Sequence, residues 1–208
     1  MEPVNLALVL ALDGSASVTF SEFVLLTTGC AAALRDDAVV AGLTSGASLV
    51  CLLLWSGPGV QEVMIDWTRI ATAEDVLAFA RDVEDVPRII PPGSTAIGEA
   101  LLACHRLLAA APAPAARWVI DIVGDGGSNA GIDPQPVRDI LVAAGVTING
   151  LCILNDEPDV LEAYTREVIG GPGAFALECR DFYSFADAMR QKLTREIADA
   201  GRLAGRPA

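Results

Sequence analysis

Side chains that end in oxygen gather in three short segments of this sequence, far apart along the chain. The first segment holds Asp13, Ser15 and Ser17, the second holds Thr95, and the third holds Asp125. Carboxylate and hydroxyl oxygens are the donors that Mg²⁺ takes in near-octahedral geometry, usually keeping some of its waters. Zinc prefers nitrogen and sulfur donors instead. The residue types therefore favour a Mg²⁺ site, with Mn²⁺ or Ca²⁺ as alternatives, if the fold brings the three segments together.

Hydrophobic periodicity predicts the elements that would position these segments. Apolar runs of strand length, typical of buried strands, lie at residues 5–12, 49–55, 118–123, 146–154 and 174–178. Helical patterns begin at a capping box formed by Thr19 and Glu22, and then cover residues 73–85, 97–109, 133–144, 158–169 and 181–200. Four apolar residues of the first helix are expected to face the sheet: Phe20, Phe23, Val24 and Leu34.

One further segment, Gln61–Trp67, alternates between apolar and polar residues, which is typical of a half-exposed edge strand. Because only a short turn precedes it, this strand should pair antiparallel with the strand before it. Strands that alternate with helices predict an α/β fold: a doubly wound, mostly parallel sheet of about six strands with helices on both faces. Ligands in such folds bind at the carboxyl ends of strands. Asp13 and Asp125 follow predicted strands, and Thr95 precedes a predicted helix.

In this sequence, Asp13-x-Ser15-x-Ser17 is followed by Thr95 and then by Asp125. This pattern resembles the metal-ion-dependent adhesion site of von Willebrand factor A domains. The resemblance implies one von Willebrand factor A-like, Rossmann-like domain over residues 1–208, with a core at 4–200 and a short tail at 201–208. It implies that the three hydroxyls contact the metal directly and that the two carboxylates act mainly through bound water. It also implies that a protein partner supplies an acidic side chain to the ion.

The likeness extends over most of the chain. Residues 5–198 are similar to a bacterial family of von Willebrand factor A-like proteins of uncharacterised function. Several motifs carry this similarity: Trp55-Ser56-Gly57, Thr95-Ala96-Ile97-Gly98, Ile148-Asn149-Gly150-Leu151, Asn155-Asp156-Glu157-Pro158 and Gly170-Gly171-Pro172-Gly173-Ala174-Phe175. The sequence departs from the expected pattern at Gly14, where a bulkier residue is typical, and at Ala16 and Ser94, where glycine is typical. These departures change the loops but leave the five oxygen-bearing residues in place.

Charge and hydropathy exclude several classes of function. The formal net charge of −13 repels phosphate backbones and anionic lipid, so neither nucleic-acid binding nor membrane insertion is expected. The apolar run Leu6–Leu12 is too short to span a bilayer, which takes about 20 apolar residues. If an export signal has been removed ahead of Met1, the protein is periplasmic or secreted; otherwise it is cytoplasmic. The oligomeric state stays open.

Other residues that could carry chemistry have simpler explanations. His105 is the only histidine, but it falls in the middle of a predicted helix, which favours a packing or surface role over that of a catalytic base. The acidic cluster of Asp156, Glu157 and Asp159 could bind Ca²⁺ or could simply begin a helix. The apolar stripe from Phe182 to Ile197 suits core packing more than docking. The chain has five cysteines, which leaves one or more unpaired within it, and Cys51 and Cys152 should lie in the core.

The sequence therefore predicts a non-enzymatic, Mg²⁺-dependent domain that binds a protein partner. One alternative is an accessory metal-binding subunit of an AAA+ or chelatase-type machine. Another is a metal-dependent hydrolase, which lacks an evident general base. Turn chemistry would explain Asp13 and Asp125 separately, but it does not require three segments to converge.

Overall fold

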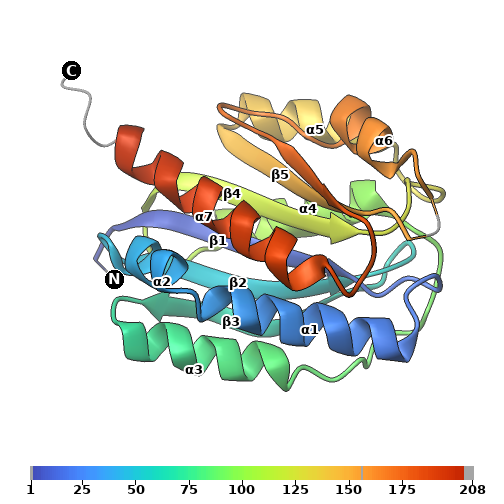
Figure 1. The fold of residues 1–208 in the computed structure, drawn as a ribbon. Helices are drawn as coiled ribbons and strands as arrows, with labels where there is room; N and C mark the ends of the chain where they lie inside the picture. The colour runs from blue at the N-terminus through green and yellow to red at the C-terminus, as the bar shows by residue number, and fades with distance from the viewer. Residues whose placement is uncertain (1, 156, 204–208) are drawn as a thin grey trace.

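The computed structural model describes residues 2–155 and 157–203, which form a six-stranded sheet between two layers of helices (Figure 1). The strand order is β3-β2-β1-β4-β5-β6. Among the described strands, only the edge strand β3 runs antiparallel to its neighbour, and the other neighbouring strands pair in parallel. The predicted fold class is confirmed. The strands are β1 (Val4–Asp13), β2 (Ser48–Trp55), β3 (Gln61–Ile70), β4 (Ala115–Gly124), β5 (Val146–Ile153) and β6 (Ala176–Cys179).

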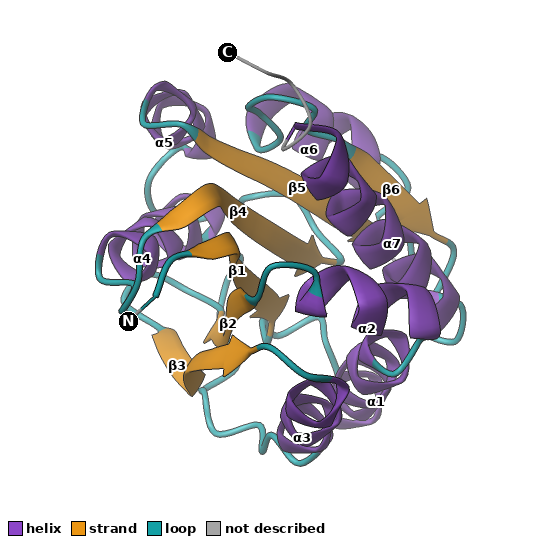
Figure 2. Ribbon diagram, turned by 90° about the vertical axis from the view of Figure 1, so that its left-hand side faces the viewer, coloured by secondary structure: helices purple, strands orange, loops and turns teal. Residues whose placement is uncertain are grey.

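Helices cover both faces of the sheet (Figure 2). One apolar core lies under α1 (Phe20–Leu34), α2 (Asp37–Thr44), α3 (Ala73–Glu84) and α7 (Phe185–Leu203). The opposite core lies under α4 (Ile97–Ala109), α5 (Pro134–Ala143) and α6 (Val160–Glu167). Every residue of β2 and β5 is buried, as expected for central strands that are covered on both faces.

Several expectations need correction. The eight-residue helix α2 was not predicted, because it spans barely two turns and offers little periodicity. Phe20 and Val24 do not face the sheet, since their side chains are 70% and 42% exposed, whereas Phe23 and Leu34 are buried as expected. The alternation in β3 predicts Val63, Ile65 and Trp67 on one side of the strand, but a register irregularity between β2 and β3 lets Ile65 pack on one core and Trp67 on the other.

The terminal helix was expected at residues 181–200, but α7 begins at Phe185 and continues to Leu203, into the predicted tail. Residues 204–208 of that tail lie outside the described residues. The apolar stripe of this segment is core packing, as expected, with five buried members: Phe182, Phe185, Met189, Leu193 and Ile197. None of the described helices is long and apolar enough to cross a membrane.

The strand order reverses between β1 and β4, whose loops leave in opposite directions, and this is where doubly wound sheets bind ligands. The two strands pair so that Leu12 lies opposite Val123. Asp13 and Gly124 therefore end adjacent strands, with Asp125 one residue further on. The fold thus brings the first and third oxygen-bearing segments to the same edge of the sheet.

Candidate metal centre

Direct hydrogen bonds join the loop after β1 to the other two loops. The backbone N–H of Ala16 donates to the carbonyl of Gly93, at 2.8 Å, in the loop that precedes α4. The hydroxyl of Ser17 donates to Oδ1 of Asp125, also at 2.8 Å, in the loop that follows β4. Residues about 80 and 108 positions apart along the chain are therefore in contact.

Asn129 joins the two remaining loops. Its side-chain oxygen accepts a hydrogen bond from the backbone N–H of Thr95 at 2.8 Å, and its own N–H donates to the Thr95 carbonyl at 2.9 Å. The three segments are thus connected in pairs. Sequence reasoning missed Asn129, although its position four residues after Asp125 in a glycine-rich loop could have indicated it.

The first loop is folded tightly around its own carboxylate. Oδ1 of Asp13 accepts a hydrogen bond from the N–H of Ser15 at 2.7 Å, and the hydroxyls of Ser15 and Ser17 lie 3.1 Å apart. Asp13, Ser15, Asp125 and Thr95 are buried, and Ser17 is exposed. The structure therefore brings together the five residues that the sequence singled out.

Among the described residues, no cation is a cause of the pKa shift of Asp13. Burial, and secondly the charge of Asp125, raise the pKa of Asp13 to about 7, while hydrogen bonds from Ser15 and from the backbone of Asp125 oppose that rise. Oδ2 of Asp13 accepts no hydrogen bond from the described part of the chain. A buried carboxylate with an unused oxygen beside a second carboxylate fits a divalent cation, which would favour the charged form of both.

Arg88 is a basic residue that contacts the backbone of the loop after β1. Its guanidinium donates to the carbonyls of Gly14 and Ser15, at 3.1 and 2.8 Å, and so stabilises the backbone of the loop. Sequence reasoning missed this contact, because nothing in the pattern around Arg88 indicates which loop it reaches.

A pocket of about 340 Å³ opens over these residues. Its walls come from all three loops and from the segment before α6: Ala16, Ser17, Gly93, Ser94, Thr95, Asp125, Gly126, Asn129 and Glu157. Exposed Glu157 accepts a hydrogen bond from the N–H of Gly127 at 3.1 Å, which connects this segment to the loop after β4. Ser17 and Glu157, which line the pocket, are exposed to solvent.

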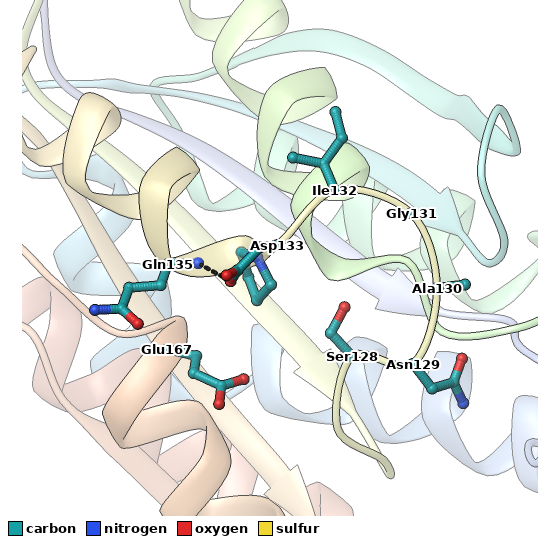
Figure 3. Close-up of a pocket in the computed structure, with 9 residues that line it drawn as sticks. Ser128, Asn129, Ala130, Gly131, Ile132, Asp133, Gln135 and Glu167 are labelled. Carbon is teal, nitrogen blue, oxygen red and sulfur yellow. Dashed lines mark hydrogen bonds between the residues drawn. The ribbon is translucent and has the colours of Figure 1, made fainter.

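A second pocket, of about 420 Å³, lies beside the first and shares Asn129 with it (Figure 3). The loop from Ser128 to Asp133 curves around it, and Glu167 of α6 faces it from the other side. Asp133 is the N-cap of α5, and its carboxylate accepts from the N–H of Gln135 at 3.0 Å. This surface extends the polar edge away from the candidate centre.

The departure at Gly14 has a structural explanation. A Cβ on Gly14 would come within 2.6 Å of Cδ1 of Ile90, so the Ile90 side chain occupies the space that a bulkier residue at position 14 would need. Alanine in place of the typical glycine at position 16 does not disturb the hydrogen bond from the backbone N–H of this residue to the carbonyl of Gly93. At the third departure, the hydroxyl of Ser94 would lie 3.1 Å from a Cβ on Gly57.

The remaining sequence candidates lie outside the centre or have structural roles. His105 is half-buried within α4 and does not line the pocket. Asp159 is the N-cap of α6 without a side-chain cap bond, and Asp156 lies outside the described residues. Cys51 and Cys152 are buried in the core, as predicted, and all five cysteines are free.

One buried residue close to the centre, Tyr164, was not predicted from the sequence to lie there. Tyr164 of α6 is fully buried, and its hydroxyl makes no hydrogen bond within the described structure. Burial raises the pKa of this phenol well above its ordinary value, and the nearby Cys152 and Asp13 raise it further. Tyr164 therefore stays a neutral hydrogen-bond donor close to the carboxylates.

Comparison with known proteins places the chain in a family. A family model described as "Protein of unknown function (DUF1194)" matches residues 3–201. No match was found among curated protein sequences.

Solved structures share the von Willebrand factor A fold. Proximal thread matrix protein 1 from the mussel byssus matches with a TM-score of 0.70 at 19% identity, over 94% of this chain and 47% of that one. A von Willebrand factor type A protein from Catenulispora acidiphila matches with a TM-score of 0.64 at 17% identity, over 93% and 43%. The pilus adhesin SpaC from Lactobacillus rhamnosus GG matches with a TM-score of 0.66 at 14% identity, over 95% and 30%. This chain spans less than half the length of each.

The mussel protein has also been solved with a zinc-occupied adhesion-site motif, and that structure matches with a TM-score of 0.66 at 19% identity, over 94% of this chain and 48% of that one.

Proposed function

We propose a binding function for this chain, which belongs to the DUF1194 family: a non-enzymatic domain that holds Mg²⁺ and captures a protein partner through it. The observation that carries the proposal is the convergence of two carboxylates and three hydroxyls, from loops joined in pairs, at the switch point of the sheet. A von Willebrand factor A fold shared with an adhesin and with a protein whose motif holds zinc supports it.

In this proposal Ser15, Ser17 and Thr95 contact the ion directly, and Asp13 and Asp125 hold its waters. Hydroxyl ligands are neutral, so a bound divalent ion keeps much of its positive charge at the open pocket. An acidic side chain of a partner can then enter the pocket as a further ligand. The oxygen-only donor set favours Mg²⁺ over zinc, because zinc prefers nitrogen and sulfur.

The centre offers carboxylates and hydroxyls but no histidine among its described lining residues, which supports binding rather than hydrolysis. Turnover of generic ester or phosphate substrates by the Mg²⁺-loaded protein, lost in Asp13→Ala, would contradict this part of the proposal. An accessory role beside an AAA+ or chelatase-type machine uses the same docking chemistry and differs only in the partner.

Calorimetric titration with Mg²⁺, Mn²⁺, Ca²⁺ and Zn²⁺ tests the proposed centre. We expect one site per chain in the unaltered protein and little or no binding in Asp13→Ala or Thr95→Ala. Asp159→Ala is a matched control, because it removes an exposed carboxylate from the neighbouring helix start. If the heats of the centre variants match those of the unaltered protein, the metal site is wrong. If Zn²⁺ binds more tightly than Mg²⁺ by more than the generally higher affinity of Zn²⁺ for protein sites explains, the choice of Mg²⁺ is wrong.

A further inference from the structure

The buried hydroxyl of Tyr164 lacks a partner in the described protein, although it lies in a fully enclosed position. Buried hydroxyls in folded proteins are nearly always hydrogen-bonded, to protein or to an ordered water. A tyrosine in an apolar core usually directs its hydroxyl toward such a partner. The Tyr164 hydroxyl is therefore expected to have a hydrogen-bond partner other than the described residues of the protein.

Gly124 shows where this hydroxyl points. A Cβ built on Gly124 would lie 2.4 Å from the hydroxyl oxygen of Tyr164 and 3.1 Å from Oδ2 of Asp13. Both oxygens thus face the same small space at the end of β4. That space is closed on another side by the ring of Trp55, whose Cη2 would be 3.5 Å from the same Cβ. Only glycine at position 124 leaves the space open.

The two oxygens do not hydrogen-bond to each other, since neither has a partner among the described residues. The distances of the two oxygens to the Gly124 position limit their separation to about two hydrogen-bond lengths. A single water molecule spans such a separation, and a small polar space with an unused donor and an unused acceptor is where buried waters are found.

We propose that Tyr164 is a positioning residue of the metal centre, whose hydroxyl holds Oδ2 of Asp13 through one bridging water. This inference rests on the proposed function. Oδ1 of Asp13 is already fixed by the N–H of Ser15, so Oδ2 is the oxygen whose direction Tyr164 can set. With both oxygens fixed, the carboxylate is presented to the ion's waters without reorganising. Groups that orient metal ligands in this way typically change metal affinity by 10–100-fold when removed.

The test is Tyr164→Phe, which removes only the hydroxyl oxygen. We expect its Mg²⁺ affinity, measured by calorimetry, to fall about tenfold. In the metal-free protein, with EDTA present, the variant should melt close to the temperature of the unaltered protein, because the water can keep its hydrogen bond to Oδ2 of Asp13 when the hydroxyl is gone. A purely structural hydroxyl would instead lower the melting temperature without metal. Tyr183→Phe is the matched control, since Tyr183 is 86% exposed.

The outcomes separate this inference from the proposed function. If the unaltered protein binds no divalent ion, the metal centre and the role of Tyr164 fail together. If it binds Mg²⁺, Asp13→Ala does not, and Tyr164→Phe binds with unchanged affinity, the centre stands and the role of Tyr164 is wrong. A loss of both affinity and metal-free stability in Tyr164→Phe would also overturn it.

Gly124→Ala gives a second measurement, because the added methyl occupies the proposed water position. Where Gly124→Ala folds, adding Tyr164→Phe to it should cause no further loss of Mg²⁺ affinity. Independent, additive losses would show that the hydroxyl does not act through that space.

Discussion

Two fully buried aspartates end up in different electrostatic situations, although they lie on neighbouring strands. Asp121 in the middle of β4 forms an ion pair with Lys192 of α7. Nζ of Lys192 also lies 3.5 Å from Oε2 of Glu196. Asp13 at the end of β1 has backbone and hydroxyl neighbours, and no cation of the described residues is among the causes of its pKa shift. The first carboxylate is neutralised within the fold, whereas the second leaves negative charge at the sheet edge where an external cation can bind.

Asn129 should matter for the metal centre more than for stability. Asn129→Ala removes the acceptor that holds the N–H of Thr95, so the Thr95 loop gains freedom next to the proposed ion. We expect about a tenfold loss of Mg²⁺ affinity in calorimetry and a fall of about 1 kcal/mol in the free energy of unfolding. Ser128→Ala is the control, because its hydroxyl reaches the same loop only through a long contact of 3.4 Å. Equal affinities for both variants would contradict the prediction.

Asp121 should make the stability of the metal-free protein depend on pH. Burial, together with Glu196, raises its pKa to about 7 despite the opposing charge of Lys192, and Cys30 of α1 also faces this group. A carboxyl with a raised pKa in the folded state stabilises the protein at pH values below about 4 and loses that contribution as the pH rises to about 7.

Urea unfolding in EDTA at pH 4.5 and pH 7.5 should therefore show a smaller decrease for Asp121→Asn than for the unaltered protein. Asp13, whose pKa is also raised to about 7, titrates over the same range in both proteins, so the difference between them isolates Asp121. An identical decrease in the two proteins would refute this explanation.

At the scale of elements, the start of α1 determines where the loop after β1 ends. Thr19 and Glu22 form a complete capping box, with the N–H of Thr19 donating to Glu22 at 2.8 Å. Thr19→Ala should lower the free energy of unfolding by about 1 kcal/mol, measured by urea denaturation, because an orphan N–H of the first turn loses its acceptor. Thr28→Ala, in the half-buried middle of the same helix, should change it much less, because its hydroxyl only donates to a carbonyl of the preceding turn. A larger effect at Thr28 would contradict the prediction.

Sequence periodicity predicted these elements because each core-facing residue lies at a strand or helix repeat. The convergence of Asp13 and Asp125 followed from strand order alone, since parallel strands end at one edge. Contacts between the layers of the fold could not be predicted from periodicity in this way. The reach of Arg88 to Gly14 and the burial of Tyr164 under Asp13 depend on which loops and helices pack together, and no local pattern records this. Phe20 was misplaced because a first-turn residue can satisfy the apolar period and still be exposed to solvent.

Helix α7 is attached to the sheet by Lys192, the only lysine of the chain, which is fully buried. Its neighbour Glu196 also accepts from the amide of Asn149 at 2.8 Å, so α7 contacts both β4 and β5 through polar groups. Lys192→Met should lower the free energy of unfolding by about 3–5 kcal/mol, because two buried carboxylates lose their cation. Arg190→Met, on the exposed side of the same helix, should be nearly neutral.

The same lysine offers a direct readout of how firmly α7 is docked. In the folded protein, an amine-reactive reagent should label Lys192 only at the rate at which α7 opens. Mass spectrometry of a proteolytic digest resolves this residue from the terminal amine. Labelling of Lys192 as fast as that of a free amine would show that its buried position is wrong.

At the scale of the whole molecule, the net charge of −13 opposes the proposed partner. A partner that supplies a carboxylate to the ion approaches a negative surface, and this repulsion acts over roughly 10 Å at 0.1 M salt but only about 3 Å at 1 M. The contact between the ion and the carboxylate is short and sheltered in the pocket, so added salt should weaken it less than it weakens the long-range repulsion.

We therefore expect acidic peptides, selected for Mg²⁺-dependent binding, to associate several-fold faster at 0.5 M than at 0.05 M salt, with little change in the dissociation rate. Surface plasmon resonance at saturating Mg²⁺ separates the two rates. Peptides with the carboxylate replaced by an amide should not bind at either salt concentration. If association instead slows as salt is added, the local field of the ion, rather than the net charge of the molecule, controls how a partner approaches the centre.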